Sequence, residues 1–196
     1  MTGIVDYKAG NLKSVQNALK RLNADFITSN KACELAKCNR IIIPGVGGAG
    51  WAMENLKKNN LVEVIRNLKC PVLGICLGLQ ILCSYSEEDD TEGIGIFPNM
   101  VSRIPSSEEI KVPDTGWNTV YDLNTPLFDG IEENSFFYFV HSYSAEINGY
   151  TCAKTDYGIK FSAALKEDNF TGCQFHPEKS GRIGQKFLQN FLTKEI

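Results

Sequence analysis

The sequence predicts an α/β fold in which a mostly parallel central sheet is flanked by helices and continued by antiparallel strands. Two observations lead to this prediction. Short apolar runs alternate with helical patterns as far as residue 82, whereas strand-like runs joined by short polar segments dominate from Gly93 onward. With 196 residues, of which 43% are hydrophobic, the chain is expected to form a single domain over residues 1–196.

The first part of the chain supplies the parallel strands and their helices. Residues 11–22 are predicted to form a helix, because Leu12, Val15, Leu19 and Leu22 recur at three- and four-residue spacing. Strands are expected at 3–7, 24–29, 40–45 and 70–76, and further helices at 31–38 and 51–68, the second of them long or broken. Strands that alternate with helices in this way indicate a parallel sheet covered on both faces.

The remainder of the sequence is predicted to form antiparallel strands, followed by one more strand and helix of the kind found in the first part. Strand-like pieces occur at 93–104, 117–123, 135–146 and 160–167. A strand at 170–176 and a closing helix at 183–195 complete the prediction. The polar stretches 84–93 and 105–114 are expected to be surface loops.

Charge and composition argue against several classes of function. The net charge is −3 and the basic residues are scattered, so the chain has no electrostatic footprint for nucleic acid. No apolar run approaches the length of a membrane span, and no secretory leader precedes the first strand, so no membrane partner is expected. Seven cysteines, an odd number, indicate a reduced, cytoplasmic protein. With two histidines and no CxxC pair, neither a metal site nor a cofactor is expected.

A cysteine between two glycines is the first candidate for chemistry. Gly74, Cys76 and Gly78 form a G-x-C-x-G pattern after an apolar run and before a run that reads as amphipathic. In an α/β sheet this pattern is typical of a sharp strand-to-helix turn that exposes a nucleophile, with small neighbours avoiding a clash. The start of the following helix would favour the thiolate. The alternative is that Cys76 is a small buried apolar residue, which is the preferred interpretation of the other six cysteines.

A thiol nucleophile needs a base, and the chain offers His141 and His176. His176 ends a strand-like run, and Glu178 follows two residues later, on the same side of an extended chain. Glu178 can therefore orient His176 while the other ring nitrogen faces Cys76, which is the arrangement that acyl transfer requires. For His141 we expect a structural or binding role.

A glycine-rich loop follows the strand at 40–45. The stretch IIIPGVGGAG (41–50) lacks the lysine of a phosphate-binding GxxxxGK[ST] loop and does not match GxGxxG. We interpret it as a mobile loop whose backbone N–H groups stabilise an oxyanion.

The motifs PGVG, GICLGLQ and FHPEKS, in this order, resemble the class I (triad) glutamine amidotransferases, and the match covers nearly the whole chain. The resemblance implies a flavodoxin-like fold and a reaction in which Cys76 attacks the side-chain amide of L-glutamine, with His176 as acid and base and Glu178 holding the imidazole. It also implies that the backbone N–H groups of Val46 and Leu77 bind the oxyanion. Family positions that contact glutamine correspond to Gly45, Gln80, Glu88, Ser142 and Tyr143.

The segments GNLKSV, GWN and YFVHSY resemble one branch of that family. Its members pass ammonia to a separate (β/α)₈-barrel synthase of histidine biosynthesis, with which they form a heterodimer. Interface positions of that branch correspond to Asn11, Trp117, Asn118, Tyr138 and Lys179. Asp114 and Thr115 depart from the histidine and apolar residue usual before GWN, and Lys8 stands where a glycine is common.

Three alternatives stay open at this point. The same glutaminase could serve a related synthase that aminates a different metabolite, such as a sugar, and the departures at Asp114 and Thr115 bear on that choice. A stand-alone cysteine hydrolase or peptidase would share the fold. A silent binding module is disfavoured, because such a relative has no chemical need to retain Cys76, His176 and Glu178 together.

Overall fold

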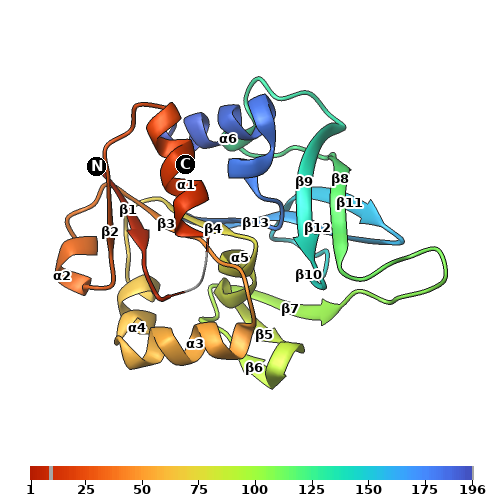
Figure 1. The fold of residues 1–196 in the computed structure, drawn as a ribbon, viewed down its shortest axis with the longest axis horizontal. Coiled ribbons are helices and arrows are strands. Elements are labelled where there is room, and N and C mark those ends of the chain that lie inside the picture. Colours follow the sequence, from red (N-terminus) through yellow and green to blue (C-terminus); the bar gives the residue numbers. More distant parts are fainter. Residues whose placement is uncertain (9–10, 196) are drawn as a thin grey trace.

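The computed structural model describes residues 1–8 and 11–195, so Gly10 of the GNLKSV segment lies outside the described residues. Its centre is a seven-stranded sheet in the order β11-β12-β13-β4-β3-β1-β2 (Figure 1). The five parallel strands are β1 (Thr2–Val5), β2 (Phe26–Ser29), β3 (Arg40–Ile43), β4 (Val72–Ile75) and β13 (Phe170–Cys173). The predicted α/β class and the parallel sheet are therefore confirmed.

Helices cover both faces of this sheet because successive strand residues point in opposite directions. In β3, Ile42 packs with α1 (Leu12–Arg21) and α6 (Gly181–Thr193), whereas Ile41 and Ile43 pack with the helices of the other face. Those helices are α2 (Ala32–Leu35), α3 (Ala49–Lys58), α4 (Leu61–Arg66) and α5 (Leu77–Leu82). The helix expected at 51–68 is thus broken, between α3 and α4. No helix of the described residues is long and apolar enough to cross a membrane.

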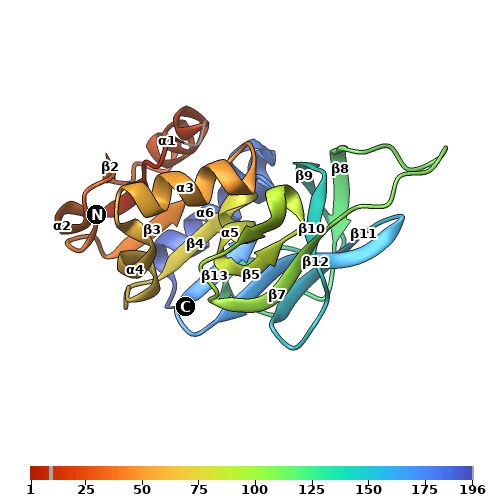
Figure 2. The same ribbon diagram turned by 90° about the horizontal axis from the view of Figure 1, so that it is seen from below.

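The antiparallel half differs from the expectation. Only β11 (Thr151–Tyr157) and β12 (Ile159–Glu167) extend the central sheet in antiparallel fashion. The other pieces form two smaller sheets, β10-β7-β5-β6 and β8-β9. Their members are β5 (Cys83–Ser86), β6 (Thr91–Glu92), β7 (Phe97–Arg103), β8 (Asp114–Val120), β9 (Ser135–His141) and β10 (Tyr143–Ala145). Viewed from below, the loop between β7 and β8 projects from one end of the molecule, which agrees with the loop predicted at 105–114 (Figure 2).

Two local predictions were wrong. The stretch 84–93 is not one loop, because it contains most of β5, the 3₁₀ turn η1 (Glu88–Asp90) and β6. The helix after Cys76 does not have one buried and one exposed face, as an amphipathic helix would, because every residue of α5 is buried. This helix lies between the central sheet and the small sheet of β7, so the polar side chain of Gln80 is enclosed with the apolar ones.

Candidate active site

Two neighbouring parallel strands bring Cys76 and His176 to one edge of the sheet. β4 and β13 pair in register, with Ile75 opposite Cys173, and the N–H of Cys76 donates to the carbonyl oxygen of Cys173 at 2.8 Å. After β4 and β13 the polypeptide leaves the sheet at the carboxyl ends of the two strands. Open α/β sheets bind ligands at this end. The two residues are separated by 100 positions in the sequence and adjoin only because β13 inserts next to β4.

The turn at Cys76 has the strained geometry expected for a nucleophile at a strand-to-helix turn, and the cysteine itself is 5% exposed. Cys76 has φ 53° and ψ −107°, backbone angles that residues other than glycine rarely adopt. The flanking glycines permit it, since a Cβ on Gly78 would lie 1.9 Å from the carbonyl oxygen of Ile43 and one on Gly74 would lie 2.6 Å from that of Gly78. Both glycines are therefore needed for packing of the elbow.

His176 and Glu178 form a buried hydrogen-bonded pair. Nδ1 of His176 lies 2.8 Å from Oε1 of Glu178, and both side chains are 1% exposed. Asn11 donates from Nδ2 to the same carboxylate oxygen at 3.2 Å, which ties the start of α1 to this pair. Within residues 1–8 and 11–195, Nε2 of His176 has no other side-chain or backbone partner, and Cys76 is the group that acts on this ring besides Glu178.

Charge around His176 favours its protonated form. Burial alone lowers the pKa of His176, but the Cys76 charge, followed by Glu178, outweighs burial and raises this pKa to about 10. The histidine is therefore a cation at neutral pH whenever Cys76 is a thiolate. A thiolate beside a cationic histidine is the arrangement required of a nucleophile that later needs an acid to protonate its leaving group.

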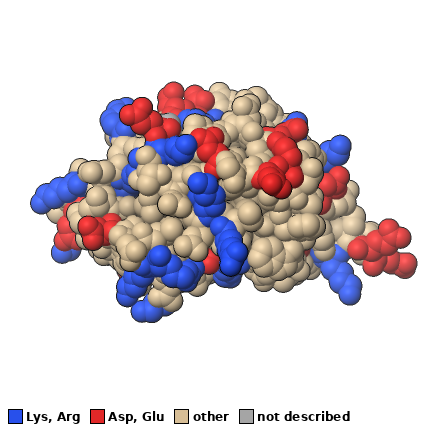
Figure 3. Space-filling view, turned by 90° about the horizontal axis from the view of Figure 1, so that it is seen from above, with Lys and Arg blue, Asp and Glu red and all other residues tan. Residues whose placement is uncertain are grey.

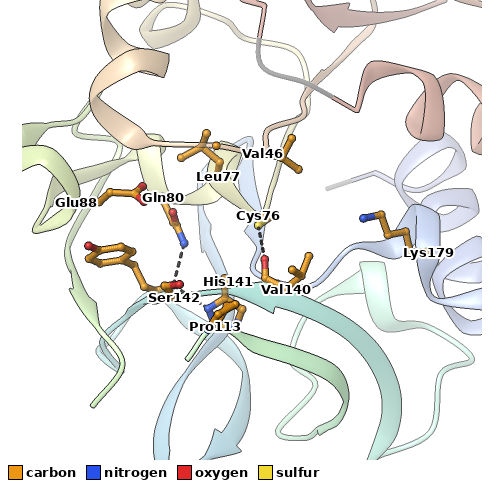
Figure 4. Close-up of a pocket in the computed structure, with 12 residues that line it drawn as sticks. Val46, Cys76, Leu77, Gln80, Glu88, Pro113, Val140, His141, Ser142 and Lys179 are labelled. Carbon is orange, nitrogen blue, oxygen red and sulfur yellow. Dashed lines mark hydrogen bonds between the residues drawn. The ribbon is translucent and has the colours of Figure 1, made fainter. Parts of the chain in front are cut away.

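A pocket of about 360 Å³ opens in front of Cys76 (Figure 4). Glu88 and Gln80 lie on one side of the sulfur and Lys179 on the other, while Val140 and His141 form the floor. The remaining lining residues are Val46, Gly47, Leu77, Pro113, Ser142 and Tyr143. A space of this size with charged groups at both ends fits a small zwitterion.

Polar contacts hold the pocket wall in place. Gln80 donates from Nε2 to the carbonyl oxygen of Tyr143 at 2.9 Å and to Oε1 of Gln174 at 3.1 Å. Gln174 in turn places its Nε2 3.6 Å from Sγ of Cys76. Glu88 accepts a hydrogen bond from the N–H of Ala49 at 2.9 Å, although burial raises the pKa of its carboxyl group. Sequence reasoning missed Gln174, whose signal is a polar residue inside the apolar strand run at 170–176.

Most residues expected to bind substrate or oxyanion meet in this pocket. Val46, Leu77, Gln80, Glu88, Ser142 and Tyr143 all line it. Gly45 does not. It is buried behind the wall, where a Cβ would lie 2.5 Å from the hydroxyl of Tyr7. Its neighbours Val46 and Gly47 form the rim, and Gly47 has φ 109°, a conformation that favours glycine.

Of the residues expected at a partner interface, three lie on the two-stranded sheet of β8 and β9, whereas Lys179 lies in the 3₁₀ turn Pro177–Lys179 and Asn11 precedes α1. Trp117, which is 52% exposed, stands opposite Tyr138, and their rings make an edge-to-face contact at 5.9 Å. Lys179 places its ammonium 5.6 Å from the centre of the Tyr138 ring. Phe136, 57% exposed on β9, adds a further aromatic side chain that sequence reasoning missed. Asn118 instead turns inward and donates to Asp114.

Three of the other cysteines are buried thiols that the proposed chemistry does not use. Burial raises the pKa of Cys83 and Cys173 well above the usual range and that of Cys152 to about 12, so these side chains remain thiols. All seven cysteines are free. Among the described residues, no cluster of three potential metal ligands occurs. Acidic and basic side chains are interspersed over the face seen from above (Figure 3), without a field of one sign.

Comparison with known proteins identifies the class. The family model "Glutamine amidotransferase class-I" matches residues 4–195. The chain therefore belongs to the class I glutamine amidotransferase family. Within that family it is similar to two proteins named imidazole glycerol phosphate synthase subunit HisH. The one from Bacteroides thetaiotaomicron is 47% identical, covering 96% of this chain and 97% of the relative, and the one from Haemophilus influenzae is 43% identical, covering 97% and 96%.

Solved structures of low identity share the fold. A glutamine amidotransferase from Thermotoga maritima superposes with a TM-score of 0.65 at 18% identity, covering 97% of this chain and 81% of that one. The structure of PurLQS from the same organism gives a TM-score of 0.71 at 19% identity, covering 97% and 96%. At this level of identity the likeness supports the architecture alone.

Proposed function

We propose that this chain is the glutaminase subunit of an imidazole glycerol phosphate synthase, which hydrolyses glutamine and delivers the ammonia to a barrel synthase subunit in histidine biosynthesis. The names of its HisH relatives supply the pathway. The observation that carries the chemistry is that Cys76, which lines the pocket, interacts with His176, whose ring is hydrogen-bonded to Glu178.

The first half of the reaction uses the ion pair at the strand ends. The Cys76 thiolate adds to the amide carbon of glutamine, and the tetrahedral intermediate collapses when His176 transfers its Nε2 proton to the departing nitrogen. Ammonia leaves, a γ-glutamyl thioester remains on Cys76, and His176 is left neutral. Protonation is essential because an amide nitrogen is otherwise a poor leaving group.

The second half reverses the role of the histidine. Neutral His176 takes a proton from water, the hydroxide adds to the thioester carbon, and the carbon–sulfur bond breaks to give glutamate and the thiolate. Glu178 keeps Nδ1 protonated throughout, which fixes the orientation of the ring. In both halves the negative oxygen is bound by the N–H of Leu77, the first residue of α5, and by that of Val46 after movement of the loop.

Glutamine is positioned by the two ends of the pocket. The carboxylate of Glu88 pairs with the α-ammonium group, and the Ser142–Tyr143 segment contacts the α-carboxylate. Gln80 supports this segment through its hydrogen bond to the carbonyl oxygen of Tyr143. The side-chain amide then points toward Cys76.

The partner is a (β/α)₈-barrel synthase that docks on the sheet of β8 and β9. The exposed aromatic side chains of Trp117 and Phe136 are of the kind that is enriched in protein interfaces. Lys179 belongs both to this face and to the pocket, so the surface and the site are contiguous. Seven free thiols support a location of the heterodimer in the reducing cytoplasm.

Glutamate release from glutamine, measured with and without the barrel synthase carrying its nucleotide ligand, tests this proposal. We expect low release from the isolated chain and strong stimulation by the liganded synthase, because uncoupled hydrolysis would waste substrate. Activity without stimulation would refute the histidine-pathway assignment and favour another acceptor or a free-standing hydrolase. No release under any condition would refute the glutaminase.

A further inference from the structure

A second buried histidine–carboxylate pair lies at the wall of the pocket. Asp114 begins β8 and His141 ends β9, and the antiparallel register places the two residues opposite one another. Nε2 of His141 lies 3.5 Å from Oδ2 of Asp114, and the side chains are 2% and 1% exposed. The proposed chemistry uses neither residue, and the aspartate stands at a position where the resemblance led us to expect a different side chain.

The contacts of the two ring nitrogens of His141 determine how many protons the ring carries. Nδ1 lies 2.8 Å from the carbonyl oxygen of Tyr143, and a carbonyl can only accept, so Nδ1 bears a hydrogen. Nε2 lies within ion-pair distance of the Asp114 carboxylate and, among the described residues, makes no hydrogen bond. If Nε2 carried no hydrogen while Asp114 was ionised, the lone pair of Nε2 would face a lone pair of the carboxylate. In a site closed to water this repulsion would be costly in free energy. One further proton must therefore reside between Nε2 and Oδ2.

The contacts of Asp114 place that proton on the imidazole. Asn118 donates from Nδ2 to Oδ2 of Asp114 at 2.6 Å, which stabilises the ionised carboxylate. The rings of Phe139 and Phe161, at 5.7 and 5.2 Å from the His141 ring, exclude water, so the two opposite charges are compensated mainly by each other.

The His141 ring is connected to the proposed glutamine site through the carbonyl oxygen of Tyr143. The carbonyl oxygen of Tyr143 accepts from His141 Nδ1 and from Gln80 Nε2, so it is held from two sides. A cationic donor makes the first of these bonds stronger than a neutral one would be. The titratable side chains that share the pocket with His141 are Cys76, Glu88, Tyr143 and Lys179. In the part of the chain that the structure describes, Asp114 is the only acidic group within ion-pair distance of the ring.

We propose that Asp114 holds His141 in the doubly protonated form and that this imidazolium positions the Ser142–Tyr143 wall of the glutamine pocket. Asp114 is thus a positioning residue that acts through His141. The inference rests on the proposed function only where it concerns glutamine, because the protonation state follows from the geometry of the pair.

The protonation state can be measured without any activity assay. The chain has two histidines, so ¹⁵N-labelled histidine gives two ring systems, which His176→Asn assigns. In the wild-type protein at neutral pH we expect both nitrogens of His141 to carry hydrogen. In Asp114→Asn we expect hydrogen on Nδ1 alone, because the compensating charge is gone. A neutral His141 ring in the wild-type protein would overturn the proposal, and this result needs no variant to fold.

The role in the pocket is tested by kinetics of glutamate release in the complex with the liganded barrel synthase. Asp114→Asn should raise KM for glutamine about tenfold while changing kcat less than about threefold, because loss of a charge-assisted bond loosens the wall and leaves the nucleophile untouched. The matched control is Asp122→Asn, which removes an exposed ion pair with Lys154 at 2.8 Å. It should alter neither KM nor the His141 signals.

The outcomes separate the two proposals. A fall in kcat with unchanged KM, or equal effects of the two aspartate variants, would refute the positioning role. Absence of glutamate release from the wild-type complex would refute the proposed function, while the ring protonation would still be decided by the spectra. Thermal unfolding of Asp114→Asn shows whether the variant is destabilised. If destabilisation alone raised KM, the KM of the variant would return to the wild-type value at lower temperature.

Discussion

The backbone N–H of His176 donates a hydrogen bond to the carbonyl oxygen of Tyr138 at 2.8 Å. Ser180 strengthens this link, since its hydroxyl accepts from the N–H of Tyr138 at 3.0 Å and donates to the carbonyl oxygen of His176 at 2.7 Å. The proposed acid and base is therefore attached directly to β9, the strand that carries the exposed aromatic surface. A displacement of β9 on docking would therefore move His176 directly, through its hydrogen bond to Tyr138.

Trp117→Ala should weaken binding of the barrel synthase by about 2 kcal/mol, as expected for an exposed tryptophan at the centre of an interface. Titration calorimetry of the purified subunits measures this change. Trp51→Ala is the matched control, because Trp51 is 45% exposed on α3, away from β8 and β9. Equal losses for both variants would contradict the assignment of the docking face.

Cys76→Ser should abolish glutamate release and leave binding of the synthase intact, because the hydroxyl is a far weaker nucleophile in this site while the elbow is preserved. Cys33→Ser, which alters an exposed thiol, should retain full activity. If Cys76→Ser also failed to bind the synthase, the cysteine would have a structural role instead.

Glu178→Gln should lower kcat by about a hundredfold or more, because Nδ1 of His176 loses its charged acceptor and the ring its fixed tautomer. Steady-state glutamate release in the complex measures the effect. The backbone at 176–180 is held by Ser180, so synthase affinity should not change. An unaltered kcat would remove Glu178 from the mechanism.

The same variant has a consequence for stability against pH. The pKa of His176 is raised to about 10 by Cys76 and Glu178 against the opposing effect of burial. A raised histidine pKa stabilises the folded state fully below the unfolded value of about 6.5, and this contribution disappears as pH rises toward 10. The difference in unfolding free energy between wild type and Glu178→Gln should therefore shrink over that interval in urea denaturation. A difference that grew with pH would contradict the sign of the shift.

Gly78→Ala should destabilise the fold by about 2–4 kcal/mol, because the new methyl group would overlap the carbonyl oxygen of Ile43 in the rigid core. Gly149→Ala is the control, since a Cβ there meets no atom within 4 Å. Thermal unfolding of the two variants measures the contrast. Comparable melting temperatures would mean that the elbow can relax.

The sequence carried enough information for the parallel core and for the local part of the site. Helical periodicity in 11–22 and the apolar run at 40–45 identify α1 and β3, and the spacing of His176 and Glu178 places them on one side of the chain. These features depend on neighbours in the sequence, which is why local patterns predict them.

Features set by distant pairing were not predictable in this way. Nothing local distinguishes a strand that extends the central sheet from one that joins a separate sheet, and so β8 and β9 were misassigned. β5 is short and polar, and its strand conformation comes from pairing with β7. The contact of Gln174 with Cys76 likewise exists only after β13 has inserted beside β4.

The complete enclosure of α5 has a practical consequence for anyone who wishes to place this activity under artificial control. Residues 77–82 tolerate neither an insertion nor a movable attachment, because each of their side chains is covered by other parts of the protein. The projecting segment 105–113 contains no regular element. A light-sensitive or ligand-sensitive module belongs in this segment, where it can regulate the entry of glutamine while the nucleophile remains undisturbed.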